Sequence, residues 1–283
     1  MANTALVWIR DDFRIQNNDA LTYATNQHDA VTTVFIFNSN IFDHKREAQK
    51  WWVSKSLENF KSDLKKLNIG LEIIKDDEIN FFSKIKSNSK ISVYWNKVYE
   101  PNELEKDKKI GTDFSKKNID FKFFKGNVLN EYNKITKNDG TPFKVYSPFW
   151  RNAEQFYLER LPDKINKVKK CKKINTLFKN QIKSEDILPK SDWYKKFEKY
   201  WEPSEQKAHE NLDNFVKKNI LNYGVDRDFP SIKGTSLLSP YIRNGQINVG
   251  DIWQKCKKLK SNNVSIKKYT NEIGWREFSH SLI

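Results

Sequence analysis

Short apolar runs alternate with amphipathic segments along roughly the first 130 residues of the chain. Five runs have the length and the aromatic or β-branched composition of buried strands, at residues 5–9, 31–37, 71–74, 91–95 and 121–124. Residues 48–67 and 103–117, between these runs, repeat apolar positions every three or four residues, as amphipathic helices do. This alternation predicts an α/β fold with a mostly parallel, open, Rossmann-like sheet.

The pattern changes after the fifth apolar run. Residues 130–190 are rich in Lys, Asn, Pro and aromatic residues and show few clear elements. Helices are then predicted at residues 203–219, 240–244, 249–259 and 266–282. We therefore expect an α/β domain at 1–130, an interdomain connector at 131–200 and part of a helical domain at 201–283.

The net charge of the chain bears on which molecules it could bind. The 283 residues include 51 Lys and Arg against 36 Asp and Glu, which gives a formal net charge of +15. Such a surplus attracts polyanions, and nucleic acid is the first to consider. Many of the charges are lysines among Asn and Ile, however, which fits AT-biased base composition equally well. The basic run at 164–173 is accordingly interpreted as a solvated helix rather than a DNA-binding groove.

Several classes of protein are excluded by simple features. No run of 18 apolar residues is present, so no membrane-spanning helix is expected, and the absence of a signal-peptide pattern predicts a cytoplasmic location. The nine glycines form neither GxGxxG nor GxxxxGKS/T, which excludes an ordinary NAD-binding Rossmann domain and a P-loop domain. Cys171 and Cys256 lack a CxxC partner and only four His are present, so neither a disulfide scaffold nor a metal site is expected.

Residues 234–247 read GTSLLSPYIRNGQI and combine hydroxyl groups with a helix start. Ser239 followed by Pro240 is a typical pair at the beginning of a helix. The hydroxyls of Thr235 and Ser236, beside the free N–H groups of such a helix start, would suit an anion. From the residues alone, a capped structural helix is the simpler interpretation.

Residues 269–280 read YTNEIGWREFSH. On a helix, Glu272, Trp275, Arg276 and Ser279 share one face. An acid, a large flat ring and a guanidinium on one face could grip a flipped-out base, because the ring stacks on it and the carboxyl group hydrogen-bonds its edge. A helix with a buried tryptophan and a Glu–Arg ion pair would show the same pattern, so the spacing alone leaves both interpretations open.

Six segments resemble motifs of the DNA photolyase/cryptochrome family, in the same order and at similar spacing. They are LVWIRDDFRIQNNDAL at 6–21, YWNKVYEPNELEKD at 94–107, VYSPFW at 145–150, NYGVDRDFP at 222–230, and the two segments at 234–247 and 269–280. The resemblance covers the whole chain and is strongest to class I cyclobutane pyrimidine dimer photolyases. It implies an antenna-type α/β domain, followed by the start of an all-α FAD-binding domain that is truncated at its C-terminal side.

The resemblance also implies roles for individual residues. Glu272 and Trp275 would be the catalytic residues that face a pyrimidine dimer. The implied flavin contacts are Tyr223, Thr235, Ser236, Leu237, Leu238, Ser239, Tyr269 and Arg276. The implied DNA contacts are Arg227, Glu272, Ile273, Gly274, Trp275, Arg276, Glu277, Phe278 and Ser279. For Arg227, a surface ion pair with Asp226 or Asp228 is the alternative, and no metal is implied.

The activity implied is that of a deoxyribodipyrimidine photo-lyase, a flavoprotein that repairs UV-damaged DNA by light-driven electron transfer from reduced FAD. A cryptochrome photoreceptor and a truncated, non-catalytic product are the alternatives, and Glu272 and Trp275 favour repair. The chain is expected to be a monomer, or to be completed by a second polypeptide that supplies the missing half. Without that half, Ile273, Trp275, Phe278 and Leu282 of the last helix should be exposed.

An antenna chromophore is less well defined by the sequence. Asn102 and Glu103 match positions that hold a folate in some relatives. The histidine that those relatives contribute is not matched, because Ile41 stands in its place and His44 is displaced. Methenyltetrahydrofolate or a deazaflavin as antenna therefore stays unassigned.

Overall fold

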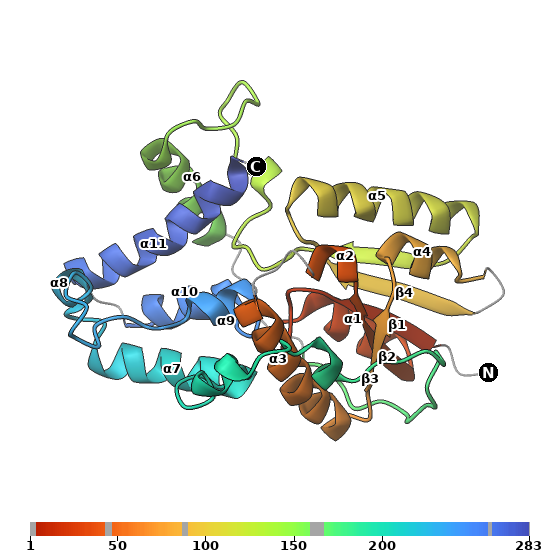
Figure 1. Ribbon diagram of the computed structural model, residues 1–283. Coiled ribbons are helices and arrows are strands. Elements are labelled where there is room, and N and C mark those ends of the chain that lie inside the picture. The colour runs from red at the N-terminus through yellow and green to blue at the C-terminus, as the bar shows by residue number, and fades with distance from the viewer. Residues whose placement is uncertain (1–3, 43–46, 87–89, 159–166, 260–261, 283) are drawn as a thin grey trace. The chain divides into compact units, whose positions relative to one another are not determined.

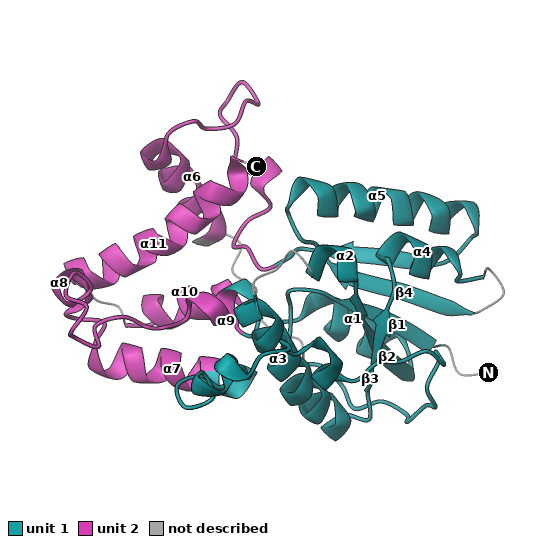
Figure 2. Cartoon of the chain, in the orientation of Figure 1, with its two compact units in different colours: residues 1–126, 166–207, 243–246 teal, residues 127–165, 208–242, 247–283 magenta. Residues whose placement is uncertain are grey.

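A computed structural model describes residues 4–42, 47–86, 90–158, 167–259 and 262–282. The chain divides into two compact units, which Figure 2 shows in different colours. Unit 1 comprises residues 1–126, 166–207 and 243–246, and unit 2 comprises residues 127–165, 208–242 and 247–283. The segment 131–200, expected to be a connector, thus contributes to both units.

Unit 1 is built around a five-stranded parallel sheet in the order β3-β2-β1-β4-β5 (Figure 1). Its strands are β1 (Thr4–Ile9), β2 (Ala30–Phe37), β3 (Gly70–Lys75), β4 (Ile91–Asn96) and β5 (Phe121–Phe124). The segments between them contain α1 (Asp19–Gln27), α2 (Ser39–Phe42), α3 (Glu47–Lys66), α4 (Glu78–Ser83) and α5 (Pro101–Lys116). The α/β class and all five predicted strands are confirmed.

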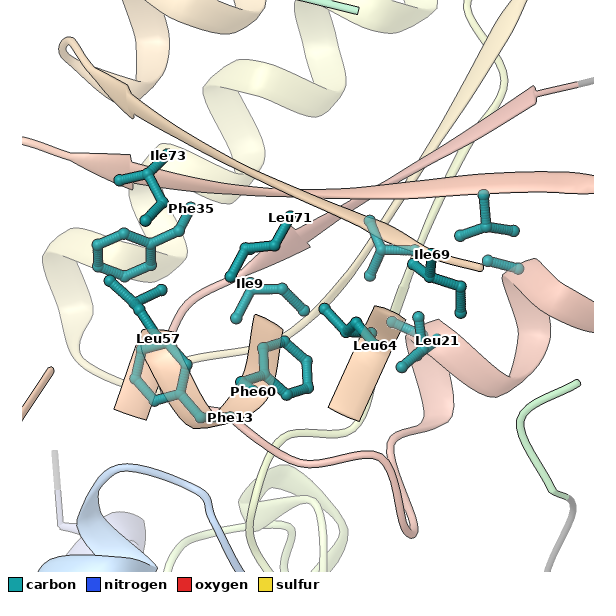
Figure 3. Close-up of a cluster of buried hydrophobic side chains, with 14 of the residues drawn as sticks. Ile9, Phe13, Leu21, Phe35, Leu57, Phe60, Leu64, Ile69, Leu71 and Ile73 are labelled. Atoms are coloured by element: carbon teal, nitrogen blue, oxygen red, sulfur yellow. The ribbon is translucent and has the colours of Figure 1, made fainter. Parts of the chain in front are cut away.

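Each face of this sheet has its own hydrophobic core, because successive side chains of β1 point to opposite faces. One core, which includes residues of α1 and α3, contains Ala5, Val7, Ile9, Phe13, Leu21, Leu57, Phe60 and Leu64 (Figure 3). The other, which includes residues of α4 and α5, contains Leu6, Trp8, Phe82, Ile110 and Phe114. Burial on both faces explains why the strands are nearly continuous apolar runs in the sequence.

The turn after α3 places a left-handed backbone at an asparagine. Asn68 has a φ of 58°, and its Nδ2 donates a hydrogen bond to the carbonyl of Cys171 at 3.1 Å. Asparagine adopts this conformation more readily than most residues because its short polar side chain can hydrogen-bond locally. Gly70, two residues after Asn68, is already the first residue of β3.

The basic run at 164–173 is not helical over residues 167–173, and residues 164–166 lie outside the described part of the chain. Its backbone is tied to unit 1, since the N–H of Cys171 donates to the carbonyl of Leu67 and that of Lys172 donates to the carbonyl of Asp29. The Cys171 side chain is buried, as is Cys256 in unit 2. The prediction of a helix was wrong because this run has too few apolar residues to define a buried helical face.

The first turns of α4 and α5 provide a matched pair for measuring a helix cap. The carboxylate of Asp77 accepts the backbone N–H of Asn80 at 3.0 Å, whereas Glu100, the equivalent residue before α5, forms no side-chain cap hydrogen bond. We expect Asp77→Ala to lower the free energy of unfolding by about 1 kcal/mol. Glu100→Ala should change it by less than about 0.5 kcal/mol. Urea unfolding of both variants tests this, and equal losses would contradict the capping role.

Unit 2 is mainly helical. It contains α6 (Tyr146–Leu158), α8 (Tyr223–Asp226), α10 (Val249–Lys257) and α11 (Val264–Ser281), with most of α7 (Glu205–Lys218) and α9 (Ser239–Arg243). Three short 3-10 helices complete the described elements: η2 (Tyr132–Lys134) in unit 2, and η3 (Ser184–Ile187) and η4 (Asp192–Lys196) in unit 1. The helices predicted from residue 203 onward are confirmed, whereas α6 was not predicted. No helix within the described residues combines the length and apolarity needed to cross a bilayer.

Asn127 connects the irregular start of unit 2 to its helices. Its Nδ2 donates to the carbonyls of Ile242 and Ile247, each at 3.1 Å, and its Oδ1 accepts the N–H of Val249 at 2.8 Å. These three hydrogen bonds hold together the end of α9 and the start of α10. One side chain therefore satisfies backbone groups at two helix ends, where partners within the helix are lacking.

Candidate functional site

The two sides of α11 have different environments. The exposed or partly exposed residues are Glu272, Trp275, Arg276 and Ser279, and the buried ones are Ile273, Gly274, Glu277 and Phe278. The exposed set is the face that the sequence spacing predicted. The buried set packs inside unit 2, and the role of these four residues as DNA contacts stays a prediction.

The expectation that Ile273 and Phe278 would be exposed is wrong. Both side chains are buried, and Phe278 packs against Tyr146 and Phe149 of α6. Only Trp275 and Leu282 of the four side chains expected at the surface are exposed. The unpredicted helix α6 thus provides part of the packing for the buried side of α11.

Trp275 is the central residue of the exposed face. Its indole stacks on the ring of Tyr146, with 3.8 Å between ring centroids and 8° between ring planes, and 48% of the residue remains exposed. The Tyr146 hydroxyl donates to the carbonyl of Asn271 at 3.0 Å, and Trp150 Nε1 donates to Asn271 Oδ1 at 3.2 Å. Asn271 therefore binds Tyr146 and Trp150 of α6, and Tyr146 in turn supports Trp275.

Gly274 allows α6 to come this close to α11. A Cβ atom at this position would lie 2.5 Å from the Trp150 ring and 2.7 Å from the Tyr146 hydroxyl oxygen. Real Cβ atoms do not approach other atoms so closely, so a larger residue would push the two helices apart. The glycine thereby makes the Tyr146–Trp275 stack geometrically feasible.

Glu272, one turn before Trp275, forms an ion pair with Arg227, which directly follows α8. The hydrogen bond to Glu272 is the main reason why the pKa of Arg227 is raised. The guanidinium also lies 5.2 Å from the centroid of the Tyr223 ring and 3.7 Å from the carboxylate of Asp228. Both partners of the pair are partly exposed, and ion pairs in such positions are worth roughly 1 kcal/mol or less, so a polar ligand can replace either one.

Tyr269, on the first half of α11, belongs to a buried aromatic cluster. Its ring lies 5.0 Å from that of Tyr223 and 4.7 Å from that of Phe215, and its hydroxyl shares a hydrogen bond with the side chain of Ser236. Burial is the main cause that raises the pKa of both tyrosine hydroxyls, which keeps them protonated. Three residues that were predicted to bind one cofactor are thus close together: Tyr223, Ser236 and Tyr269.

The loop before α9 is backbone-strained at Leu237. Its φ of 53° lies in the left-handed region, which costs a non-glycine residue about 1 to 2 kcal/mol, and its side chain is exposed. The side chains of Thr235 and Ser239 are also exposed, whereas that of Leu238 is buried. Strain of this kind persists where the surroundings hold it, often at ligand sites. The loop therefore presents two hydroxyl groups around a strained residue.

Gly234 begins this loop at a point of very close approach. A Cβ there would lie 2.5 Å from the Cβ of Asp226, so the loop can pass α8 only with a glycine. Arg276, the last of the predicted cofactor contacts, is partly exposed, and its Nη1 lies 3.5 Å from Oε1 of Glu277. Within the described part of the chain, no group of three or more His, Cys, Asp or Glu side chains is arranged to hold a metal ion.

Comparison with known proteins identifies the family. The family model for DNA photolyase matches residues 5–167, which is more than half of the chain. The chain belongs to the DNA photolyase family. A deoxyribodipyrimidine photo-lyase from Agrobacterium fabrum (strain C58 / ATCC 33970) is 30% identical over 282 residues, which cover 98% of this chain and 58% of that relative.

Solved photolyase-family structures share the fold. The crystal structure of a bacterial class III photolyase from Agrobacterium tumefaciens superimposes with a TM-score of 0.88 at 30% identity, covering 100% of this chain and 59% of that one. A cryptochrome from Synechocystis sp. PCC6803 gives a TM-score of 0.84 at 16% identity, covering 98% of this chain and 60% of that one. The chain therefore spans about three fifths of the length of these relatives. The expected class I membership is not confirmed, because the photolyase from Agrobacterium tumefaciens belongs to class III.

In this photolyase-family chain, the candidate antenna residues lie in unit 1. Asn102 is exposed in the first turn of α5, whereas the carboxylate of Glu103 pairs with Lys106 at 2.6 Å and with Arg10 at 3.4 Å. Arg10 directly follows β1, and α5 follows β4, so these groups lie near the carboxyl ends of adjacent strands at which the strand order reverses. Open α/β sheets usually bind ligands there. The antenna role of Asn102 and Glu103 stays a prediction, and His44 lies outside the described residues.

Proposed function

We propose that this chain acts in light-driven repair of UV-damaged DNA as a deoxyribodipyrimidine photo-lyase, which splits cyclobutane pyrimidine dimers with FAD as cofactor. The observation that carries the proposal is the exposed face of α11, where Trp275 offers a half-exposed ring one turn from the carboxylate of Glu272. The alternative interpretation of this segment was a helix with a buried tryptophan, and the exposure of Trp275 disagrees with it. Family membership and the photo-lyase relative at 30% identity support the same activity.

The exposed face suits a nucleobase that has left the duplex. Stacking of a base on an aromatic side chain contributes about 1–3 kcal/mol, and a carboxylate beside the ring accepts hydrogen bonds from the base edge. A dimer is weakly paired, so its extrusion costs less than that of an intact base, and this supplies part of the selectivity. Arg227, paired with Glu272 in the absence of DNA, has the charge to bind a backbone phosphate when DNA is present.

The residues of the loop before α9 fit a phosphate-containing cofactor. Thr235 and Ser239 offer exposed hydroxyl donors, and the close approach at Gly234 together with the strained Leu237 shapes the loop around them. We assign this loop to the diphosphate of FAD, and Tyr223, Ser236, Tyr269 and Arg276 to the remainder of the cofactor. Bound and reduced FAD would supply the light-driven electron. Ser236 of this loop also lies close enough to the Tyr269 hydroxyl to lower its pKa slightly, against the larger effect of burial, which raises it.

A cryptochrome photoreceptor is the second candidate, because the Synechocystis cryptochrome has the same fold over 98% of this chain. A signalling protein has no need for a dimer-binding face. The presence of both Glu272 and an exposed Trp275 on one side of α11 therefore favours repair. A chain that shows light-induced flavin chemistry but does not bind dimers would favour the photoreceptor.

A chromophore measurement followed by a repair assay tests the proposed function. The purified 283-residue chain should show flavin absorbance, or acquire it on addition of FAD, and release the flavin on denaturation. Blue light should then remove dimers from a dimer-containing oligonucleotide, whereas the same sample in darkness should not. Thr235→Ala combined with Ser239→Ala should lower flavin affinity, and Ser231→Ala, at an exposed serine before the loop, is the matched control. A chain that takes up no FAD, or that takes it up and removes no dimers in light, would contradict the proposal.

A further inference from the structure

The stack of Tyr146 on Trp275 points to a specific function for Tyr146, which the proposed function does not include. We propose that Tyr146 is a positioning residue that holds the indole of Trp275 by one ring face and leaves the other face for a single nucleobase. The inference rests on the proposed repair function, because it concerns how the same site receives the lesion. When DNA is bound, the phenol, the indole and the base would form a three-layer stack.

The geometry shows that the surrounding protein imposes this stack. Free aromatic pairs prefer offset or edge-to-face arrangements with centroids about 4.5–7 Å apart. The two rings instead lie nearly parallel at 8°, with centroids only 3.8 Å apart, so they overlap almost completely. Phe278, edge-on to both rings at 6.0 Å, closes one side of the pair.

Tyr146 itself is fixed from two directions. Its hydroxyl donates to the backbone carbonyl of Asn271 on α11, and the absence of a side chain at Gly274 leaves room for that hydroxyl. Burial, with a smaller contribution from Glu272, raises the pKa of Tyr146 to about 12, so the phenol stays neutral and keeps donating under the conditions of a DNA-binding experiment. Tyr146 is therefore a rigid support, whereas Trp275 on its own would be a surface side chain free to change rotamer.

This support should increase affinity for a stacked base. Half of Trp275 is exposed although one ring face is covered, so the accessible area lies on the opposite face and the ring edge. Ordering a mobile side chain on binding weakens affinity by about 2- to 13-fold, and a ring that is already ordered avoids this loss. Removal of the Tyr146 ring should accordingly weaken dimer binding by about fivefold, less than removal of Trp275 itself.

Three substitutions of Tyr146 in the full chain test the proposal, with a reporter on Trp275 that does not depend on DNA. The protein is labelled with 5-fluorotryptophan, and the ¹⁹F resonance of Trp275 is assigned by its loss in Trp275→Phe. In Tyr146→Leu this resonance should shift and broaden, because the ring current and the restraint are both lost. Tyr146→Phe retains the stacked ring and loses only the hydroxyl bond to Asn271, so its signal should lie closer to that of the wild type than the signals of the variants without a ring. Tyr146→Met is the second variant without a ring, for use if the leucine variant does not fold.

The DNA arm measures the ratio of affinities for dimer-containing and undamaged oligonucleotides of the same sequence. This ratio should fall about fivefold in Tyr146→Leu or Tyr146→Met and fall less in Tyr146→Phe, whereas a merely structural effect would lower both affinities together. An unchanged ¹⁹F resonance, or a changed resonance with an unchanged ratio, would overturn the positioning role. If Trp275→Phe and Trp275→Ala also leave the ratio unchanged, the proposed lesion site fails as well, and the ¹⁹F arm shows separately whether the stack exists.

Discussion

Trp275→Ala is expected to weaken binding of a dimer-containing oligonucleotide by about tenfold or more. Among the described residues of α11, the indole is the only large flat surface on the exposed face, and base stacking on an aromatic side chain is worth about 1–3 kcal/mol. Binding of undamaged DNA depends mainly on phosphate contacts, so it should change by less than about twofold. Fluorescence anisotropy with labelled oligonucleotides at one fixed salt concentration measures both affinities.

The matched control for this experiment is Trp193→Ala. Trp193 lies in η4 of unit 1, is 38% exposed, and donates its Nε1–H to the carboxylate of Glu47. Its replacement removes a similar amount of exposed aromatic surface from a place outside the proposed lesion site. Equal affinities of wild type and Trp275→Ala for damaged DNA would refute the site, as would equal losses in the two alanine variants.

The sheet was predictable because its strands are buried on both faces. In β1, Leu6 and Trp8 enter one core while Val7 and Ile9 enter the other, so the strand is a continuous apolar run that no amphipathic helix would contain. The strand order could not be deduced in the same way. Register and neighbours in a parallel sheet depend on contacts between segments far apart in the sequence, and apolar runs of similar composition do not distinguish them.

A proline in its first turn makes α6 hard to predict from the sequence. Pro148 follows Tyr146 and Ser147 in the first turn of the helix, where backbone N–H groups have no partner within the helix and proline is therefore tolerated. In a segment rich in Lys, Asn and Pro, it indicates a loop instead. The helix also accounts for the burial of Phe278, which was expected to be exposed for lack of the C-terminal half but packs against Tyr146 and Phe149 of α6.

The candidate site was predictable only in part, for the same physical reason. Helical spacing placed Glu272 and Trp275 together on one face, and the structure has them there. No spacing connects Tyr146 or Arg227 to these residues, because the stack and the ion pair join separate helices. The distinction between the exposed residues of α11 and the buried Glu277 also required knowledge of what packs behind the helix.

Glu277→Ala is expected to lower the free energy of unfolding by about 3 kcal/mol, in contrast to Glu272→Ala on the opposite side of the same helix. The Glu277 side chain is 3% exposed, and its Oε2 accepts the backbone N–H groups of Leu129 and Asn130 at 2.9 and 3.1 Å. Removal of a buried acceptor costs roughly 1–3 kcal/mol for each donor it served. The exposed ion pair of Glu272 with Arg227 should contribute less than about 1 kcal/mol.

Urea unfolding of the two variants, combined with the affinity for dimer-containing DNA, separates the roles of the two carboxylates. Glu272→Ala should retain stability and lose preference for damaged DNA, because its carboxylate is available to a base edge. Glu277→Ala should lose stability, and any remaining folded protein should keep that preference, because its carboxylate faces the backbone of residues 129 and 130. Equal stability losses would mean that the two sides of α11 do not divide packing from recognition, and the reverse pattern would place the recognition face on the side of Glu277.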